Sequence, residues 1–200
     1  MSSFTPKKPI LAVDIDEVLC DFMGALVKFH NAVYETSLSS TDFHSYSFHE
    51  VWGGTSAQCQ DKMSLFFSSS HFLVGLQPVA GAQAMTKVLK EYYDLHLVTS
   101  RQHKLEEITR VWIRKHFPDT FIDIHFGNHY CEPGQKSIPK SELCKAINAV
   151  LLIDDSLTYA VDCSSHDIPV ILFGNYAWNR GSVPEKKAHL VSRVNSWEGI

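Results

Sequence analysis

The chain has 200 residues, 44% of them hydrophobic, which suits one domain with its own core and room for a small insertion. Its formal net charge is −4 and it has no long run of Lys or Arg, so binding to a nucleic-acid polymer is not expected. No apolar stretch reaches the roughly 18 residues of a transmembrane helix, which argues against membrane association. The start lacks a signal-peptide core, and the five cysteines form no Cys-x-x-Cys motif, so we expect a cytoplasmic protein.

The first predicted strand covers residues 10–14 and ends in two carboxylates. Residues 10–13 are all apolar, which is typical of a strand buried on both faces of a parallel sheet. Asp14 and Asp16 follow at the carboxyl end, the edge where open α/β sheets bind ligands. A carboxylate there can hold a hard cation or act as a nucleophile. Taken alone, however, the Asp-x-Asp pattern is also typical of a solvated turn.

A helical insertion is predicted between the first and second strands. Apolar residues recur at helical spacing in 22–33 and 59–67, and an irregular aromatic segment lies between them. We expect residues 22–75 to form a small cap over the strand ends, with residues 1–21 and 76–200 forming the core domain. Four aromatic residues of the cap are candidate substrate contacts, although packing inside the cap is the commoner role: Phe43, Tyr46, Phe48 and Trp52.

Four further apolar runs predict strands at residues 95–99, 121–126, 150–154 and 168–173. Helical patterns separate them, including apolar faces in residues 85–92 and 105–116. This alternation of strand and helix predicts an α/β fold, with a parallel five-stranded sheet, helices on both faces and right-handed crossovers.

The ends of two other predicted strands carry polar residues as well. Thr99 and Ser100 follow the second strand, where hydroxyl and backbone N–H groups can hold phosphate oxygens. Asp154 and Asp155 follow the fourth strand, just as Asp14 and Asp16 follow the first. Crowded carboxylates repel one another unless a cation neutralises them, and Mg²⁺ is the fitting ion.

A lysine near these strand ends would complete a phosphate site. Lys140 stands just before the helix that leads into the fourth strand, so its ammonium could reach the same crevice. Lys136 and Lys145 lie in the same region and are rivals for this role.

Four segments of the chain resemble, in order and spacing, the motifs of the haloacid dehalogenase superfamily of phosphatases: Asp14-Ile15-Asp16-Glu17-Val18, Val98-Thr99-Ser100, Lys140 and Ile153-Asp154-Asp155. The resemblance implies a Rossmann-like fold. The small cap after the first motif, and residues 71–82 leading into the next helix, are most similar to the 5′(3′)-deoxyribonucleotidase group. Two positions depart from the pattern: Glu17 stands where many members carry Gly, and Arg101 where these nucleotidases carry Pro.

The resemblance also implies roles for the acidic residues. Asp14 would be the nucleophile, forming an aspartyl-phosphate, and would also bind Mg²⁺. Asp16 would act as general acid and then general base, with its backbone carbonyl on the metal. Asp154 would be the third protein ligand, and Asp155 would bind through water or orient the ligands. Thr99, Ser100 and Lys140 would hold the phosphate oxygens.

Three functions remain open from the sequence. The first is a Mg²⁺-dependent phosphomonoesterase whose small phosphorylated substrate is a nucleoside or deoxynucleoside monophosphate. The second keeps this chemistry but acts on a sugar phosphate or another metabolite, and the third is a binding or regulatory protein that has lost turnover. A small cap can leave the pocket partly open, so the partner in a homodimer could help to close it.

Overall fold

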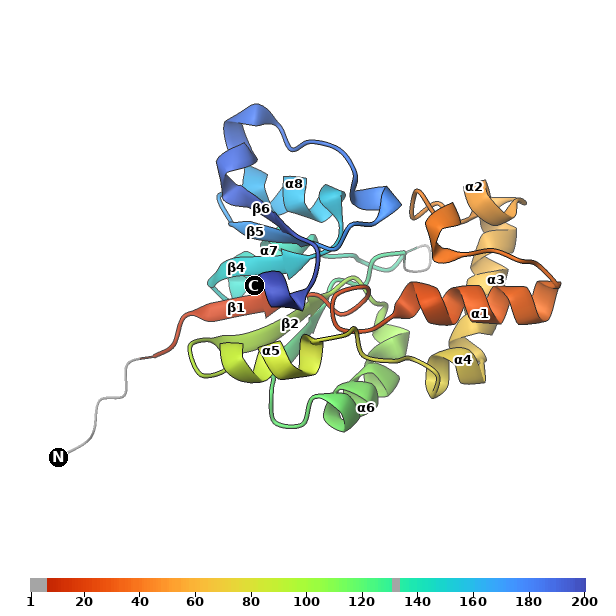
Figure 1. The fold of residues 1–200 in the computed structure, drawn as a ribbon, viewed down its shortest axis with the longest axis horizontal. Coiled ribbons are helices and arrows are strands. Elements are labelled where there is room, and N and C mark those ends of the chain that lie inside the picture. The colour runs from red at the N-terminus through yellow and green to blue at the C-terminus, as the bar shows by residue number, and fades with distance from the viewer. Residues whose placement is uncertain (1–6, 131–133) are drawn as a thin grey trace.

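The apolar runs of the sequence form strands of one parallel sheet in the computed structural model, which describes residues 7–130 and 134–200 (Figure 1). The strand order is β3-β2-β1-β4-β5-β6, so the first strand lies at the centre. The strands are β1 (Ile10–Val13), β2 (Asp94–Thr99), β3 (Asp123–Phe126), β4 (Ala149–Asp154), β5 (Val170–Phe173) and β6 (Val191–Val194). The predicted α/β class with a parallel, Rossmann-like sheet is confirmed.

The expected number of five strands was wrong, because β6 adds a sixth at the edge of the sheet. It pairs in parallel with β5, from Val170 opposite Val191 to Phe173 opposite Val194. None of its four residues is fully buried, whereas β1, β2 and β4 each end in three buried residues. An edge strand with a half-exposed pattern lacks the apolar run that marks the central strands.

Side chains alternate between the two faces of the sheet and meet a different helix pair on each. Leu11 and Val13 of β1 face the core shared with α5 (Ala82–Leu89) and α6 (Glu106–His116). Ala12 faces α7 (Lys140–Ala146) and α8 (Leu157–Ser165) instead. Figure 1 shows these two helix pairs on opposite sides of the sheet. The sheet is therefore covered on both faces, and its carboxyl edge is left for a site.

Four helices lie between β1 and α5, where a helical insertion was predicted. They are α1 (Phe22–Tyr34), α2 (His49–Trp52), α3 (Ser56–Ser68) and α4 (Ser70–Leu73). Asp21 accepts a hydrogen bond from Gly24 N at 2.9 Å and so caps α1, and a capping box between Thr55 and Gln58 starts α3. An aromatic cluster built on Phe22, Phe66 and Phe72 holds α1, α3 and α4 together.

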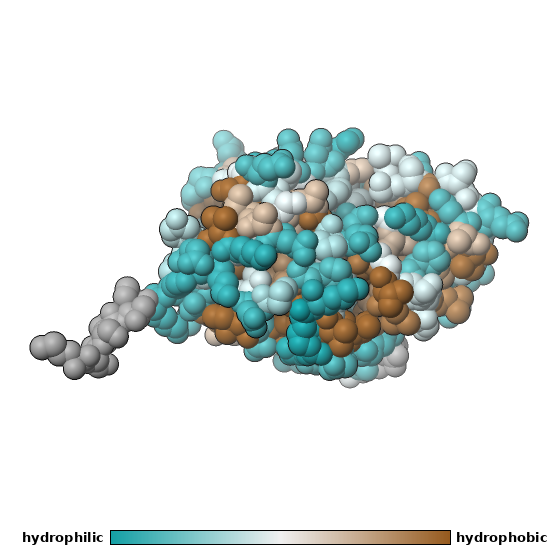
Figure 2. Space-filling model, turned by 60° about the horizontal axis from the view of Figure 1, so that its bottom comes forward, coloured by the Kyte–Doolittle hydropathy of each residue, from teal (hydrophilic) through white to brown (hydrophobic). Residues whose placement is uncertain are grey.

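Among the described residues, no helix is both long enough and apolar enough to cross a bilayer. On the face drawn in Figure 2, hydrophilic side chains separate the hydrophobic ones into smaller groups. Four of the five cysteines lie in the described ranges, and these four are free thiols.

Candidate active site

The loop after β1 has a tightly bonded backbone that fixes the first acidic residues. Asp14 immediately follows the strand, and its N–H donates to the carbonyl of Ile153 at 2.9 Å. Glu17 has a φ of 61°, in the left-handed region. A residue with a side chain is strained in this backbone conformation, whereas Gly adopts it without strain. This conformation gives a physical reason for the Gly that many superfamily members carry at this position.

Glu17 also stabilises the first turn of α1. Its Oε1 accepts a hydrogen bond from Met23 N at 2.6 Å, one of the N–H groups that a helix start leaves free. Burial raises the pKa of Glu17 to about 8, and the nearby Asp21 and Asp16 add to this rise. The Glu at this position therefore links the loop of the site to the first cap helix.

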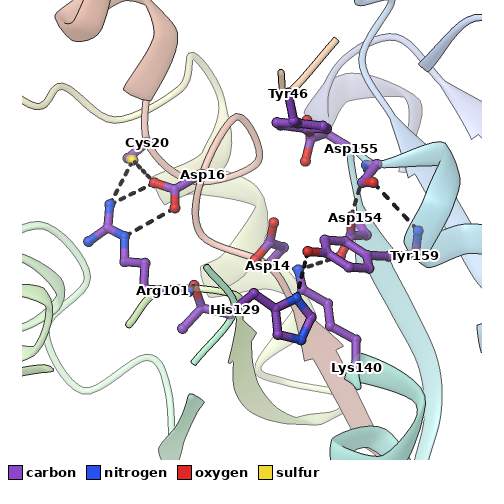
Figure 3. Close-up of polar contacts among 12 residues, drawn as sticks. Asp14, Asp16, Cys20, Tyr46, Arg101, His129, Lys140, Asp154, Asp155 and Tyr159 are labelled. Carbon is purple, nitrogen blue, oxygen red and sulfur yellow. Dashed lines mark hydrogen bonds and ion pairs between the residues drawn. The ribbon is translucent and has the colours of Figure 1, made fainter. Parts of the chain in front are cut away.

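Three carboxylates meet at the carboxyl edge of the sheet (Figure 3). Asp14 follows β1, Asp154 ends β4, and Asp155 is the next residue. One oxygen from each of the three side chains lies within 4.8 Å of the other two, and all three residues are buried. Strands β1 and β4 are direct neighbours in register, which is why residues far apart in the chain converge here.

Lys140 lies beneath this group and pairs with two of its members. Its Nζ is 2.7 Å from Asp14 Oδ1 and 2.6 Å from Asp154 Oδ2, and the side chain is fully buried. Lys136 and Lys145 are both exposed, so Lys140 is the lysine that the fold brings to the site. The helix α7 begins at Lys140 itself, with Pro139 at its N-cap.

Burial and the charges of neighbouring residues set the pKa values of this group. Burial raises the pKa of Asp14 to about 7; Asp154 and Asp16 add to the rise, and Lys140 opposes it. Burial, followed by repulsion from Asp154 and Asp14, holds the pKa of Asp155 well above its usual range. Burial alone would lower the pKa of Lys140, but Asp14 and Asp154 hold it well above its ordinary value.

The donor set fits a hard divalent cation. It consists of oxygen ligands only, and few of them, which suits Mg²⁺. With all three carboxylates ionised, the single ammonium of Lys140 leaves two negative charges uncompensated in a buried site, and a divalent ion would neutralise them. Asp14, Asp154 and Asp155 are the side chains that would hold it.

The carboxylate of Asp16 is not part of this group. Its Oδ1 lies 2.7 Å from Arg101 Nη2 and its Oδ2 lies 3.1 Å from Arg101 Nε. Cys20 Sγ is 3.3 Å from Oδ1 on the same side. Figure 3 shows this cluster apart from Asp14 and Asp154. The expected metal contact through the backbone carbonyl of Asp16 stays a prediction.

The two expected phosphate-binding residues after β2 lie at the same edge of the sheet. Thr99 ends the strand and is fully buried; its Oγ1 accepts a hydrogen bond from Arg101 N at 3.2 Å. Ser100 follows, and within residues 7–130 and 134–200 its buried Oγ has no hydrogen-bond partner. A buried hydroxyl without a partner is costly, and a phosphate oxygen would supply one.

Of the four cap aromatics considered from the sequence, Tyr46 alone is seen to reach the acidic residues. Its hydroxyl donates to Asp155 Oδ2 at 2.5 Å. Phe43, Phe48 and Trp52 instead pack on one another, with ring centroids 5.3–6.0 Å apart. These three residues pack inside the helical insertion, the commoner role of such residues.

Three residues at the site were not anticipated from the sequence. Trp178 donates its Nε1–H to Asp155 Oδ2 at 2.7 Å. The Tyr159 ring lies over Lys140, with its centroid 4.6 Å from Nζ, and His129 Nδ1 lies 2.7 Å from the Tyr159 hydroxyl. Tyr159 sits in the first turn of the helix after Asp154-Asp155, a position that could have suggested it; no sequence signal points to His129 or Trp178.

A protein-family comparison identifies one family over nearly the whole chain. The family described as 5′ nucleotidase, deoxy (pyrimidine), cytosolic type C protein matches residues 8–199. No curated protein sequence gives a significant match.

Solved structures of similar fold include hydrolases of the haloacid dehalogenase class. A haloacid dehalogenase-like hydrolase from Bacteroides fragilis has a TM-score of 0.64 at 17% identity, over 95% of this chain and 97% of its own. A HAD-superfamily hydrolase from Geobacter sulfurreducens has a TM-score of 0.61 at 14% identity, over 98% and 96%. The HAD-hydrolase YfnB from Bacillus subtilis, in a magnesium-bound structure, has a TM-score of 0.59 at 14% identity, over 96% of each chain. These similarities show a shared fold.

Proposed function

This chain belongs to the cytosolic type C family of 5′ nucleotidases, deoxy (pyrimidine), among the haloacid dehalogenase phosphatases, and from that premise we propose a Mg²⁺-dependent nucleoside monophosphatase. The observation that carries the proposal is the buried group of Asp14, Asp154 and Asp155 with Lys140 at hydrogen-bond distance from the first two. Residues 22–75 act as its cap in this proposal, and the cytoplasm is its compartment.

The nucleophile of the reaction is Asp14. One of its oxygens attacks phosphorus, the bond from phosphorus to the nucleoside oxygen breaks, and an aspartyl-phosphate forms. Asp16 supplies a proton to the departing oxygen, then takes one from the water that hydrolyses the acyl phosphate. Hydrolysis releases inorganic phosphate and restores the Asp14 carboxylate, so atoms and protons balance over the two steps.

The remaining site residues hold the phosphoryl group during both steps. When bound, Mg²⁺ offsets charge on the phosphate oxygens and on the carboxylates that hold it. Lys140 places a permanent positive charge beside Asp14, which orients the nucleophile and favours the added negative charge of the transition state. Ser100 binds the non-bridging oxygens through its buried hydroxyl. Thr99, the last residue of β2, also contacts these oxygens.

Phosphate release from a panel of substrates tests this proposal directly. Purified protein is assayed on deoxynucleoside and nucleoside monophosphates, on sugar phosphates and on p-nitrophenyl phosphate, with and without Mg²⁺. We expect Mg²⁺-dependent release, with the nucleotides giving the highest kcat/KM. A higher kcat/KM for sugar phosphates would show that these, and not nucleotides, are the preferred substrates. No phosphate release from any substrate would favour a binding or regulatory role.

A further inference from the structure

One hydrogen bond from the cap ends on a carboxylate of the proposed metal site. Tyr46 lies in the cap segment between residues 42 and 49, and its hydroxyl donates to Asp155 Oδ2 at 2.5 Å. The two residues are 109 positions apart in the chain. Figure 3 shows the Tyr46 ring directly beside Asp155, with Asp14 and Asp154 further into the site.

The same oxygen of Asp155 accepts a second hydrogen bond, from the core. Trp178, in the 3-10 turn Ala177–Asn179 after β5, donates its Nε1–H at 2.7 Å. Tyr176 stacks on the Trp178 indole with centroids 4.6 Å apart and an interplanar angle of 7°, and its hydroxyl donates to the carbonyl of Glu17 at 2.9 Å. The indole is therefore held in place from the side of the nucleophile loop.

Two donors on one oxygen fix the orientation of a carboxylate. The hydroxyl and the indole N–H both use Oδ2, which leaves Oδ1 of Asp155 to serve the ion. Hydrogen bonds of this kind to a metal-binding carboxylate set its orientation and raise the affinity of the site. One of the two donors belongs to the core, and the other belongs to the cap.

We propose that Tyr46 is a positioning residue that latches the cap onto Asp155, so that cap closure and metal retention are coupled. The proposal rests on the proposed function, because it assigns Asp155 to the metal site. By thermodynamic linkage the coupling acts in both directions: a closed cap favours the bound ion, and a bound ion favours the closed cap. We refer to the hydrogen bond between Tyr46 and Asp155 as the Tyr46 latch.

The surroundings of Tyr46 suit this role. Tyr46 is 37% exposed, and its hydroxyl lies on the Asp155 carboxylate at 2.5 Å. The ring centroid also lies 5.8 Å from that of Trp178, so the cap and core donors touch one another. Phe43 and Phe48 anchor the segment in the cap interior, which makes the latch move with the cap.

The test compares Tyr46→Phe with a matched control, Tyr34→Phe. Both changes remove one phenolic oxygen from the cap, but the Tyr34 ring contacts Phe29, His30 and Lys62 inside the cap and lies at the end of α1. A third variant, Trp178→Phe, removes the indole N–H that donates to Asp155 from the core and keeps an aromatic ring. Two quantities are measured: the Mg²⁺ dissociation constant by calorimetry, and amide hydrogen exchange in residues 43–52.

Each variant has its own expected pattern. Tyr46→Phe should weaken Mg²⁺ binding by about 10- to 100-fold, the usual effect of losing an outer partner of a metal ligand. In metal-free protein it should also speed hydrogen exchange in residues 43–52 by about 10-fold, and Mg²⁺ should no longer slow that exchange. Trp178→Phe should weaken Mg²⁺ binding with little change in metal-free exchange, and Tyr34→Phe should match the wild type in both.

Failure of the latch is distinguishable from failure of the proposed function. Equal metal-free exchange in the wild type and Tyr46→Phe would overturn the latch, whatever the metal does. An unchanged Mg²⁺ dissociation constant in Tyr46→Phe would overturn the coupling. A wild-type protein that binds no Mg²⁺ would refute both the coupling and the metal dependence of the proposed reaction, and the metal-free comparison would still decide whether Tyr46 closes the cap.

Discussion

Arg101 donates two hydrogen bonds to the carboxylate of Asp16, from Nη2 to Oδ1 at 2.7 Å and from Nε to Oδ2 at 3.1 Å. The Arg101 side chain is only 3% exposed, and its Nη1 donates to Thr109 Oγ1 at 3.0 Å. Its guanidinium carbon also lies 5.4 Å from the centroid of Phe72 in α4, so one residue joins the core, the Asp16 loop and a cap helix. The Asp16 side chain is 29% exposed, so loss of the carboxylate, which leaves the buried guanidinium without its counterion, costs more than loss of Arg101.

A double-mutant cycle on Arg101 and Asp16 should show strong coupling. Arg101→Met leaves the partly exposed Asp16 without its counterion and should lower the free energy of unfolding by about 2 kcal/mol. In the double variant with Asp16→Asn neither charge remains, so its loss should be smaller than the sum of the two single losses. Urea denaturation of the four proteins gives the coupling energy; additive losses would show that the pair contributes no interaction energy.

Asp14→Asn should abolish phosphate release while leaving the fold intact. An amide oxygen cannot serve as the attacking nucleophile, whereas Lys140 keeps its contact with Asp154 at 2.6 Å. The measurements are phosphate release with Mg²⁺ and the circular dichroism spectrum of the variant. Wild-type turnover in this variant would refute the role of Asp14 as nucleophile.

Asp16→Asn should slow the reaction most when the leaving group is poor. A nucleoside oxygen needs a proton as it departs, but p-nitrophenolate leaves readily without one. The ratio of kcat/KM for a nucleoside monophosphate to that for p-nitrophenyl phosphate should therefore fall in the variant. An equal rate loss for both substrates would indicate that Asp16 acts only in the hydrolytic step or through its contact with Arg101.

Lys140→Met should make the stability of the protein depend strongly on Mg²⁺. Without the ammonium, Asp14 and Asp154 face each other in a buried pocket, which should destabilise the metal-free protein by about 3 kcal/mol. Mg²⁺ should then raise the melting temperature more in the variant than in the wild type. Lys136→Met and Lys145→Met are matched controls at exposed positions, and a similar response in either would argue against a special role for Lys140.

The cap should lose stability below neutral pH because of His30. The residue is buried, stacks on Trp52 with an interplanar angle of 4°, and has Lys62 Nζ at 3.1 Å from Nε2. Burial, followed by the charge of Lys62, lowers the pKa of His30 from 6.5 to about 4. Between these pH values the unfolded chain binds a proton that the folded chain does not, so stability falls as pH falls.

His30→Gln removes this titration and provides the comparison. From about pH 7.5 to 5.5 the wild type should lose about 1 kcal/mol more of its free energy of unfolding than the variant does. Urea denaturation at the two pH values measures the difference. An equal loss of unfolding free energy in both proteins would show that groups other than His30 cause the pH dependence.

The convergence of the site could be predicted because it follows from parallel strands. Buried runs ending in Asp14, Thr99 and Asp154 must bring those residues to one edge once the strands pair in parallel, and hydrophobic periodicity is enough to find the runs. Lys140 was a candidate because it was expected just before the helix that feeds β4; in the structure it is the first residue of that helix. Its burial, which separates it from Lys136 and Lys145, is seen only in the folded protein.

The remaining contacts depend on packing between segments that no sequence pattern connects. Arg101 meets Asp16 across 85 positions, and Trp178 meets Asp155 from a turn beyond β5. Phe43 and Tyr46 lie in the same aromatic segment, yet one is fully buried in the cap and the other reaches the core. The sequence alone therefore identifies the acidic residues but not the partners that orient them.

The central place of β1 has a consequence for synthesis of the protein. The ribosome produces Asp14 more than a hundred residues before β4 with Asp154 and Asp155, and Trp197, which donates to the carbonyl of Val18 at 2.8 Å, comes later still. A growing chain thus carries an unpaired, strongly apolar first strand until its neighbours emerge. Such a nascent polypeptide cannot assemble the three-carboxylate group until β4 has been synthesised.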